Sequence, residues 1–476
     1  MMCGIIGILA HTPVAAELYE GLVHLQHRGQ DMAGILTCDD RMHLKVGHGK
    51  ANEVFKQADM DGLTGHFGLG HLRYPTRGND TINEAQPLIT TFPYGIGLVH
   101  NGNIVNYDAL KAGLIQSRRY IDSASDSELL LKYFAHLLAA YPLSNDSQQM
   151  FEHLCQVAMT IYQHVEGAYS IIIAMVGIGL FVMRDPQGIR PLVMGQRQGR
   201  NGTEYCFASE DVPFDNLGFI RAGDVARGEV LFVDTHGQLF RQTLLQKPFR
   251  PCVFEYVYFS RPDSTLNQVS VYQSRIRMGE YLAHAWRKAY PDLLPDVVVP
   301  IPFTSNTPAI SFAHTLGVRY SEGLYKNVFV GRTFIMSTPE KRSKSVKAKL
   351  CPQVSELQGK RVLLLDDSIV RGTTSREIVK IVREAGAKEV YLVSACPPVK
   401  FACYYGIDIP IAEELIADQY DSQDAIAAAL GVDKLLYQTI PDLFAALYDA
   451  SVLPEDRKIQ KPCMACLDND YCAGKI

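Results

Sequence analysis

Two aspartates in the C-terminal half of the sequence directly follow a short apolar run and precede a loop rich in hydroxyl groups. The run, residues 362–365, has the length and composition of a buried parallel strand, and Asp366 and Asp367 mark its end. The loop that follows contains Arg371, Gly372, Thr373, Thr374 and Ser375. Unpaired backbone N–H groups at a helix start, a glycine that allows close approach and hydroxyl donors together bind a phosphate monoester. Carboxylates beside such a loop hold a divalent cation or accept hydrogen bonds from sugar hydroxyls, so the stretch predicts a site for a phosphorylated sugar with magnesium.

A helix is predicted after this loop, because Ile378, Ile381, Val382 and Ala385 share one face and Gly386 ends the pattern. The Walker pattern and the dinucleotide pattern GxGxxG are both missing from the loop, which argues against an NTPase or a Rossmann dehydrogenase. The simpler interpretation is a pair of solvated acids and a serine that caps a helix. The complete ordered string favours the phosphate site.

A cysteine close to the start of the chain is a candidate nucleophile. Cys3 is followed by Gly4 and by an apolar strand, residues 5–9. As residue one of the mature chain, Cys3 could use its own α-amine, with a pKa of about 8, as the general base. That chemistry requires the loss of Met1 and Met2, either by a translation start at Met2 followed by methionine removal or as a minimal propeptide. The alternative is a chance cysteine without catalytic function.

Length and charge limit the architecture and the class of protein. A chain of 476 residues predicts two domains and a short appendage, which we place at residues 3–246, 247–450 and 451–476. The net charge is −5 and there is no Lys/Arg-rich arm, so nucleic acid is not an expected partner. The sequence shows neither an apolar run of transmembrane length nor a signal peptide, so we expect no membrane association and a cytoplasmic location.

The string DDSIVRGTT, residues 366–374, resembles the phosphoribosylpyrophosphate (PRPP) loop of type I phosphoribosyltransferases, in the form found in the amidophosphoribosyltransferase family. The resemblance assigns Asp366 and Asp367 to the ribose hydroxyls and to magnesium, and residues 371–375 to the 5-phosphate. A second strand-to-helix loop follows the apolar run at residues 296–302. By resemblance it is the pyrophosphate loop, with Thr304 near the magnesium and Ser305 beside it, although a simple helix cap is the alternative.

Four motifs in the N-terminal half resemble the class II glutamine amidotransferase domain: QHRGQDMAG at 26–34, GHLRYPTRG at 70–78, HNGNIVN at 100–106 and SDSE at 125–128. The resemblance implies that the side-chain amide of Asn101 and the N–H of Gly102 form the oxyanion hole for Cys3. It also assigns Arg73, assisted by Thr76, to the α-carboxylate of glutamine, and Asp126 to its α-ammonium. Taken singly, Arg73 could be a surface ion pair and Asp126 the cap of a helix at residues 127–141.

Residues 325–350 are the most basic part of the chain. They carry seven Lys and Arg side chains against one acid, Glu340. A charge run is usually a solvated helix or loop face. This one lies between the two proposed phosphate loops and resembles the family's flap that closes over PRPP and excludes water.

Eleven scattered cysteines do not suggest a disulfide framework in a reducing compartment. Five of them are expected to be small core residues: Cys38, Cys155, Cys206, Cys351 and Cys396. The tail contains a CxxC pair, Cys463 and Cys466. With Cys252 and Cys403 this pair matches the ligands of the iron-sulfur-containing branch of the family, which implies a structural [4Fe–4S] cluster. Zinc and free thiols are the alternatives, and Cys472 fits no ligand position.

Together the motifs predict a two-domain α/β and α+β protein. The resemblance implies that an N-terminal-nucleophile hydrolase αββα sandwich precedes a type I phosphoribosyltransferase domain with a doubly wound parallel sheet. The family resemblance implies formation of 5-phosphoribosylamine, glutamate and pyrophosphate from PRPP and glutamine, the first step of purine synthesis. It also implies a homotetramer, feedback inhibition by purine nucleotides and activation of the glutaminase by PRPP. A hexose-phosphate amidotransferase would lack the DDSIVRGTT loop, and a PRPP-sensing regulator has no use for a glutamine site. If Cys3 is not N-terminal, an ammonia-dependent transferase is the alternative.

Overall fold

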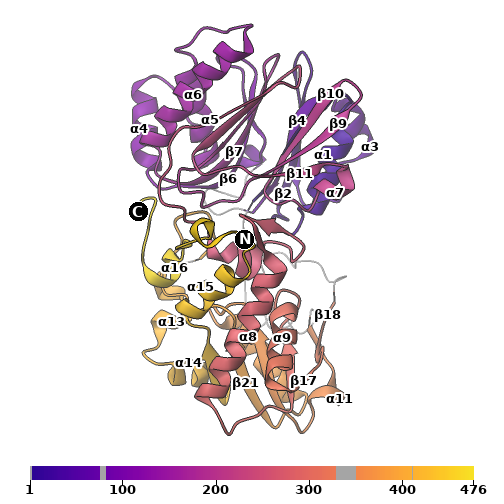
Figure 1. The fold of residues 1–476 in the computed structure, drawn as a ribbon, viewed down its shortest axis with the longest axis vertical. Helices are drawn as coiled ribbons and strands as arrows, with labels where there is room; N and C mark the ends of the chain where they lie inside the picture. The colour runs from indigo at the N-terminus through magenta and orange to yellow at the C-terminus, as the bar shows by residue number, and fades with distance from the viewer. Residues whose placement is uncertain (1–2, 75–81, 328–349, 410, 476) are drawn as a thin grey trace.

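The computed structural model describes residues 3–74, 82–327, 350–409 and 411–475. Thr76 and most of the basic segment 325–350, including Glu340, lie outside the described residues. The N-terminal half forms the upper part of the molecule in Figure 1 and the C-terminal half the lower part, while the C-terminal tail, in yellow, lies between them.

The upper part is built on two antiparallel sheets. The described residues place seven strands in the first sheet, in the order β11 (Ile220–Asp224), β9 (Val193–Gly199), β10 (Gly202–Ala208), β1 (Gly4–Leu9), β4 (Phe67–Arg73), β2 (Met32–Cys38) and β3 (Met42–His48). They place six in the second, in the order β13 (Leu239–Thr243), β12 (Glu229–Asp234), β8 (Gly179–Arg184), β7 (Gly167–Met175), β6 (Ile96–Ile104) and β5 (Leu88–Thr90).

The two sheets pack face to face because alternate side chains of their strands are apolar. Ile5 and Leu69 of the first sheet share one buried cluster with Val99 and Ile172 of the second. Helices cover the outer faces (Figure 1): on the first sheet α1 (Ala15–His24), α2 (Ala51–Val54), α3 (Gln57–Gly62) and α7 (Phe214–Leu217), and on the second α4 (Tyr107–Gln116), α5 (Asp126–Leu138) and α6 (Ser147–His164). The predicted αββα sandwich is confirmed.

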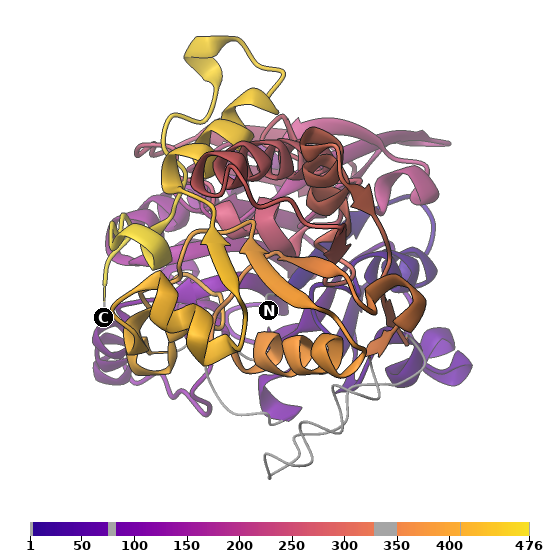
Figure 2. The same ribbon diagram turned by 90° about the horizontal axis from the view of Figure 1, so that it is seen from below.

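The lower part contains a parallel sheet. The described residues place five strands in it, in the order β17 (Arg319–Tyr320), β16 (Val297–Pro300), β20 (Arg361–Asp366), β21 (Glu389–Ser394) and β22 (Lys434–Tyr437). One face packs on α8 (Val271–Ala289) and α9 (Asn306–Leu316), and the other on α12 (Thr373–Glu384) and α14 (Gln423–Leu430), as Figure 2 shows from below. The strand order reverses between β16 and β20, and ligands of doubly wound sheets bind at the carboxyl ends of the strands at such a reversal.

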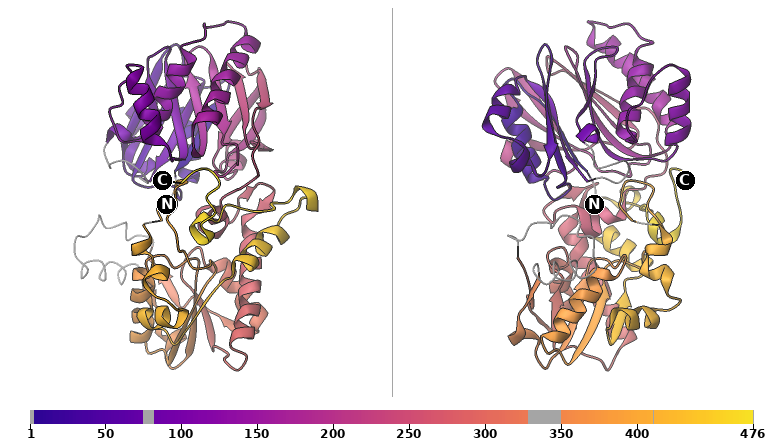
Figure 3. Two further views of the ribbon diagram at one scale, coloured as in Figure 1. Left: turned by 90° about the vertical axis from the view of Figure 1, so that its left-hand side faces the viewer. Right: turned by 180° about the vertical axis from the view of Figure 1, so that it is seen from behind.

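The smaller elements connect the two parts. A short hairpin, β14 (Thr265–Leu266) with β15 (Val269–Ser270), leads into α8, and α15 (Ile440–Asp449) packs along that helix. The tail then returns past α16 (Ala465–Asp468) to the region between the two parts (Figure 3). There the N–H of Val253 donates to the carbonyl of Cys463 at 3.1 Å, and the N–H of Cys463 donates to the carbonyl of Pro251 at 2.9 Å.

Two expectations from the sequence are wrong in detail. Cys351 is exposed, because it lies on β19 (Leu350–Pro352), which among the described residues pairs with β18 (Leu324–Lys326) in a two-stranded sheet outside the main one. Asp126 is the first residue of α5 rather than its cap, since the side chain of Ser125 accepts the N–H of Ser127. Within the described residues, none of the helices is both long and apolar enough to span a bilayer.

Candidate active sites

The pairing of β1 with β4 brings the candidate nucleophile beside the predicted glutamine-binding arginine. Gly4 lies opposite Leu72 in this pairing, so Cys3 and Arg73 are neighbours at the ends of adjacent strands. The Cys3 Sγ atom lies 3.9 Å from the carbonyl oxygen of Tyr74. Cys3, Arg73, Gly102 and Asp126 line one small cavity of about 20 Å³. The structure therefore brings together four of the residues that the motifs nominated.

The oxyanion-hole candidates lie on β6. The side chain of Asn101 is buried, and its Nδ2 atom has no hydrogen-bond acceptor among the described residues. Gly102 has a φ of +156°, and a Cβ atom there would lie 1.9 Å from the carbonyl oxygen of Ala168, so only glycine fits. A buried amide donor without an acceptor and a neighbouring N–H on a glycine are the groups that a developing oxyanion requires.

The two residues predicted to bind the charged groups of glutamine are both buried. Arg73 makes an ion pair with Glu84, with Nη2 and Oε2 2.6 Å apart, and also donates to the carbonyl oxygen of Glu84. Asp126 accepts the N–H of Ile104 at 3.1 Å. The sequence motifs did not indicate Glu84, because this residue lies outside all four of them. A ligand carboxylate would have to share the Arg73 guanidinium with Glu84.

Three further residues that line the cavity were not nominated from the sequence: His100 and Ser127 stand inside quoted motifs, whereas Gln86 lies between two of them. Gln86 accepts the N–H of His100 at 2.7 Å and donates to the Ser127 hydroxyl at 2.9 Å, while His100 Nδ1 lies 3.0 Å from the same hydroxyl. Burial lowers the pKa of His100, with Asp126 opposing that effect. Burial also raises the pKa of the Cys3 thiol, which Arg73 partly opposes. The thiol therefore needs a base to ionise at neutral pH.

A buried arginine anchors Cys3 to the rest of the molecule. Arg28, from the QHRGQDMAG motif, donates its Nε–H to the carbonyl oxygen of Cys3 at 3.2 Å. Its other nitrogens bind Glu210 and, at 2.8 and 3.0 Å, the two oxygens of Glu255 in the π-helix η2 (Glu255–Phe259). Burial disfavours the charge on Glu210, but His27 and Arg28 outweigh it and hold the pKa of Glu210 well below its usual range. This network joins the start of the chain to the beginning of the second half.

The predicted phosphate loop forms a second cavity, of about 340 Å³, at the carboxyl end of β20. All of the residues nominated from that stretch line it: Asp366, Asp367, Arg371, Gly372, Thr373, Thr374 and Ser375. Gly372 has a φ of +71°, and a Cβ atom there would lie 2.4 Å from the Ile416 side chain. The glycine is therefore required for the loop to reach the start of α12.

The two aspartates are held in a setting that disfavours two negative charges. Burial, followed by the charge of Asp367, raises the pKa of Asp366 well above its usual range. Burial also raises the pKa of Asp367 to about 6, although Arg275 of α8 opposes it. A divalent cation would offset the repulsion between the buried carboxylate of Asp366 and the half-buried carboxylate of Asp367, so the residues present fit magnesium.

The residues of the second proposed phosphate loop lie apart from this cavity. Thr304 and Ser305 follow β16, which pairs with β20, so both loops leave the same edge of the sheet, but neither residue lines the cavity. Ile301 does line it. Ser305 is fully buried, and its hydroxyl has no hydrogen-bond partner among the described residues.

Residues 404–409, here named the linking segment, connect the two cavities. Ile407, Asp408 and Ile409 line the phosphate cavity. At the other end, the carbonyl oxygen of Tyr404 accepts from the side chain of Asn103 at 2.9 Å. A Cβ atom on Gly406 would lie 2.9 Å from the carbonyl group of Gly102, so this glycine packs directly on the candidate oxyanion hole. The sequence motifs did not indicate these contacts.

The four predicted cluster ligands gather where the linker, the linking segment and the tail meet. The backbones of Cys252 and Cys463 pair in an isolated parallel β-bridge, and both cysteines are free thiols. Lys400 and Phe401 donate their N–H groups to the carbonyl oxygen of Cys466, each at 3.0 Å. Cys403 Sγ accepts the N–H of Tyr405 at 3.4 Å. Hydrogen bonds from backbone N–H groups to sulfur are typical surroundings for cluster thiolates.

The electrostatic surroundings of these cysteines suit an anionic group. Burial disfavours the charge on Arg190, but Cys252, Glu255 and Cys403 outweigh it and raise the pKa of Arg190. The described residues contain no group of three or more His, Cys, Asp or Glu side chains that converges on a single metal ion. Three buried thiols and one half-buried thiol beside the buried Arg190 fit an anionic metal cluster, which Cys252, Cys403, Cys463 and Cys466 would hold. The neighbouring Cys472 thiol, together with burial, raises the pKa of Cys463 well above its ordinary value, and the sequence did not predict that these two cysteines are neighbours.

The chain is similar to known proteins both over its N-terminal half and over its whole length. Residues 71–216 match the model of a glutamine amidotransferase domain. The chain is 44% identical to the amidophosphoribosyltransferase of Pseudomonas aeruginosa over 100% of its own length and 94% of the relative's, and 46% identical to that of Escherichia coli over 94% and 88%. The structure is similar to glutamine PRPP amidotransferase from B. subtilis complexed with ADP and GMP, with a TM-score of 0.85, 34% identity and coverage of 99% and 98%. A structure described as the allosteric regulatory enzyme of purine biosynthesis gives 0.86 at 34% identity, covering 99% and 96%.

Proposed function

The chain belongs to the amidophosphoribosyltransferase family, and from this membership we propose that it transfers ammonia from glutamine to PRPP at the first step of purine biosynthesis. The products are 5-phosphoribosylamine, glutamate and pyrophosphate. The observation that carries the proposal is the linking segment, which lines the phosphate cavity with Ile407–Ile409 and packs Gly406 on Gly102 of the glutamine cavity. Two separate activities would not require that contact.

The glutaminase step follows from the groups around Cys3. The thiol attacks the side-chain amide carbon of glutamine, and its proton passes to the α-amine of a mature chain that begins at Cys3. Asn101 Nδ2 and the Gly102 N–H stabilise the oxyanion. Arg73 holds the α-carboxylate and Asp126 the α-ammonium, with Thr76 assisting. Ammonia leaves, and water then releases glutamate from the thioester.

The transferase step requires positioning rather than covalent help. The N–H groups and hydroxyls of residues 371–375 bind the 5-phosphate, and Asp366 and Asp367 orient the ribose hydroxyls. Magnesium would be held by Asp366 and Asp367, with Thr304 assigned to it by resemblance, and would supply charge that stabilises the departing pyrophosphate. Ser305 is assigned to the same pyrophosphate loop by resemblance. Ammonia attacks the anomeric carbon from the opposite face.

The test separates the two halves of the activity. We expect Cys3→Ala to abolish formation of 5-phosphoribosylamine from glutamine while leaving formation from added ammonium salts within about twofold of the wild type. The N-terminal residue of the wild type, read by mass spectrometry, should be Cys3. A mature chain that retains Met1 or Met2 together with full glutaminase activity would overturn the nucleophile assignment. An ammonia-dependent activity alone would establish the alternative transferase.

We assign the chain to the iron-sulfur branch of the family, with Cys252, Cys403, Cys463 and Cys466 as ligands of a structural [4Fe–4S] cluster. Two observations support the assignment: Cys252 and Cys463 are paired through their backbones, and the pKa of the neighbouring Arg190 is raised by Cys252, Glu255 and Cys403 despite burial. Thiol ligands and a thiol nucleophile must stay reduced, which supports a cytoplasmic location. An analysis of iron and acid-labile sulfide tests the assignment, because a [4Fe–4S] cluster contains both, whereas a zinc site and free thiols contain neither.

Regulation and assembly complete the proposal. The B. subtilis protein was described in complex with ADP and GMP, which supports inhibition of this enzyme by purine nucleotides. A homotetramer is proposed from family membership, and its mass in solution by light scattering tests it. The domain limits 3–246, 247–450 and 451–476 are supported by the end of β13 at Thr243 and by the tail's return to Cys252.

A further inference from the structure

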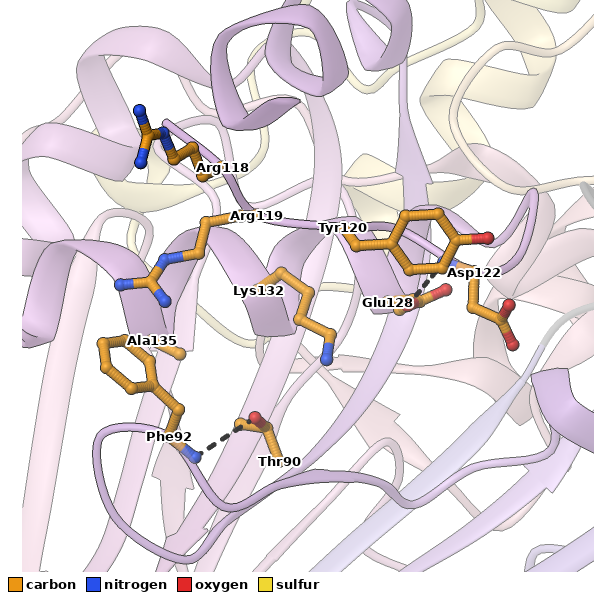
Figure 4. A pocket seen from close by; sticks show the side chains of 9 residues that line it. All are labelled: Thr90, Phe92, Arg118, Arg119, Tyr120, Asp122, Glu128, Lys132 and Ala135. Atoms are coloured by element: carbon orange, nitrogen blue, oxygen red, sulfur yellow. Dashed lines mark hydrogen bonds between the residues drawn. The ribbon is translucent and has the colours of Figure 1, made fainter. Parts of the chain in front are cut away.

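A cavity of about 250 Å³ lies on the outer helical layer of the sandwich, away from both proposed sites. Its walls come from the end of β5, the loop before α5 and the first turns of α5 (Figure 4). Arg118, Arg119 and Lys132 contribute three positive side chains to this cavity. None of the functions proposed above uses them.

Arg119 is held in place without satisfying all of its hydrogen-bond donors. Its guanidinium carbon lies 3.8 Å from the centroid of the Phe92 ring, a cation–π contact that fixes the plane of the group. The Nε atom is buried and has no acceptor in the part of the chain that the structure describes. Stacking covers one face of the guanidinium and leaves its edge, where the N–H groups point, for an acceptor from outside the chain.

Lys132 provides a second positive charge from a different element. In Figure 4 its ammonium group points toward the loop that carries Thr90 and lies between Arg119 and Glu128, whereas Arg118 extends away from it. Across the described residues, no ion pair of 4 Å or less forms to Lys132 or to Arg119. Two cations from separate elements that line one cavity, neither of them in an ion pair within the described residues, favour a dianionic ligand.

The two acids of the cavity do not neutralise these cations. Glu128 accepts the N–H of Asp122 at 3.0 Å, and both the N–H and the hydroxyl of Ser123 at 2.7 Å, so its carboxylate is committed to the loop. Asp122 lies at the opposite end of the cavity from Arg119 in Figure 4. The cationic end therefore keeps its positive charge.

An exposed aromatic ring adds an apolar wall. The side chain of Tyr120 is 76% exposed and lines the cavity beside Glu128 and Asp122 (Figure 4). The volume of about 250 Å³ is below the usual range for drug-sized ligands of roughly 300 Å³ and more, which favours a small molecule. We propose that this cavity binds a small ring-bearing phosphate monoester, with its phosphate between Arg119 and Lys132 and its ring against Tyr120.

Binding there would reach the glutamine site through α5. Glu128, at the cavity, and Asp126, at the glutamine cavity, lie in the first turn of the same helix. A ligand that draws Lys132 and the loop before α5 together would bias the position of Asp126. We therefore expect occupancy to change the KM for glutamine more than the kcat.

Calorimetric titration of the full-length protein with phenyl phosphate tests the proposal. The wild type should bind at two sites per chain, the outer cavity and the phosphate loop. Arg119→Gln with Lys132→Gln should remove one of them, and Thr373→Val with Thr374→Val should remove the other. Lys111→Gln, on the neighbouring helix α4, is the matched control and should keep both. Unchanged thermal melting and ammonia-dependent activity of the Arg119/Lys132 variant show that it is folded.

Two further comparisons define the ligand chemistry. Tyr120→Ala should weaken phenyl phosphate about tenfold and leave inorganic phosphate unchanged, since only the former has a ring. Benzoate, a monoanion, should bind at least tenfold more weakly than phenyl phosphate. The proposal is wrong if the Arg119/Lys132 variant keeps both sites, if the Thr373/Thr374 variant loses all binding, or if benzoate binds as tightly as phenyl phosphate.

Discussion

The buried side-chain amide of Asn101, which lacks a hydrogen-bond acceptor in the described part of the chain, is expected to act in catalysis rather than to stabilise the fold. Its Nδ2 atom is buried and donates to no acceptor among the described residues, so the amide donor contributes no hydrogen bond to the resting fold. Asn101→Ala should lower kcat for glutamine hydrolysis by about 100- to 1,000-fold, the usual loss for one oxyanion donor, and leave ammonia-dependent synthesis intact. Steady-state kinetics with each nitrogen source checks this.

Asn106→Ala is the matched control for that change. Asn106 Nδ2 donates to the carbonyl of His164 at 2.8 Å and its Oδ1 accepts the N–H of Glu166 at 3.0 Å, away from the glutamine cavity. The control should lower the melting temperature while it keeps kcat. An Asn101 variant with normal kcat would remove Asn101 from the oxyanion hole.

The raised pKa of Asp367 gives the transferase site a pH dependence. Burial raises the pKa of Asp367 to about 6, whereas the unfolded chain ionises near about 3.9. Between these values the unfolded chain binds fewer protons than the native state. The metal-free native state is therefore favoured at low pH, and this contribution is lost as the pH rises through about 6. At neutral pH the ionised carboxylate costs about 3 kcal/mol.

Asp367→Asn should therefore raise the melting temperature of the metal-free protein at pH 7 by several degrees, although it should abolish synthesis of 5-phosphoribosylamine. In the wild type, affinity for magnesium–PRPP should fall as the pH is lowered from 7 to 5, because protons compete for the carboxylate. Scanning calorimetry and binding titrations at each pH measure both effects. A variant less stable than the wild type at pH 7 without metal would contradict the assignment.

At the scale of elements, the sequence was most informative where one short stretch contains both a strand and the loop that uses it. The apolar run before Asp366 and the glycine at 372 predicted β20, its loop and the start of α12, because parallel strands end where ligands bind. The side-chain partners were not predictable in this way. The contact of Arg73 with Glu84, the burial of Ser305 and the exposure of Cys351 depend on packing between elements, which local patterns do not encode.

The linking segment gives a prediction at this scale. Gly406 has a φ of +100°, and an added Cβ would lie 2.9 Å from the carbonyl group of Gly102. Gly406→Ala should push the segment off the oxyanion strand. We expect stimulation of glutaminase by PRPP to fall about tenfold or more, and glutamate to be released in excess of 5-phosphoribosylamine. The ratio of the two products, with and without PRPP, is the measurement.

Gly431→Ala is the control for backbone strain alone. Gly431 also has a positive φ, +76°, but an added Cβ would meet only a Val379 methyl at 3.9 Å. This variant should lose stability and keep the product ratio. If both variants uncouple the products equally, the contact with Gly102 is not the cause.

At the scale of the whole molecule, the contacts that hold the halves together connect residues far apart in the sequence. Arg28 binds both Glu210 and Glu255, and its backbone partner is Cys3. The motif around Arg28 predicted the family, but a single sequence gives no indication which distant acids an arginine pairs with. The four cysteines were nominated from the spacing of the tail pair together with the family resemblance, whereas the position of Cys472 beside Cys463 was not predicted.

The cysteine site gives the last prediction, because it joins the linker, the linking segment and the tail. Serine at Cys252, Cys403, Cys463 or Cys466 should each lower iron from about four atoms per chain to near zero and lower the melting temperature, since the cluster is bound only in the native state. Cys472→Ala, which removes the thiol beside Cys463 but no ligand, should keep its iron. Iron and sulfide analysis of anoxically purified variants distinguishes these outcomes. Loss of iron from the Cys472 variant, or its retention in any of the four serine variants, would require a different ligand set. A wild-type protein without iron would mean that protein contacts alone hold the linker, the linking segment and the tail together.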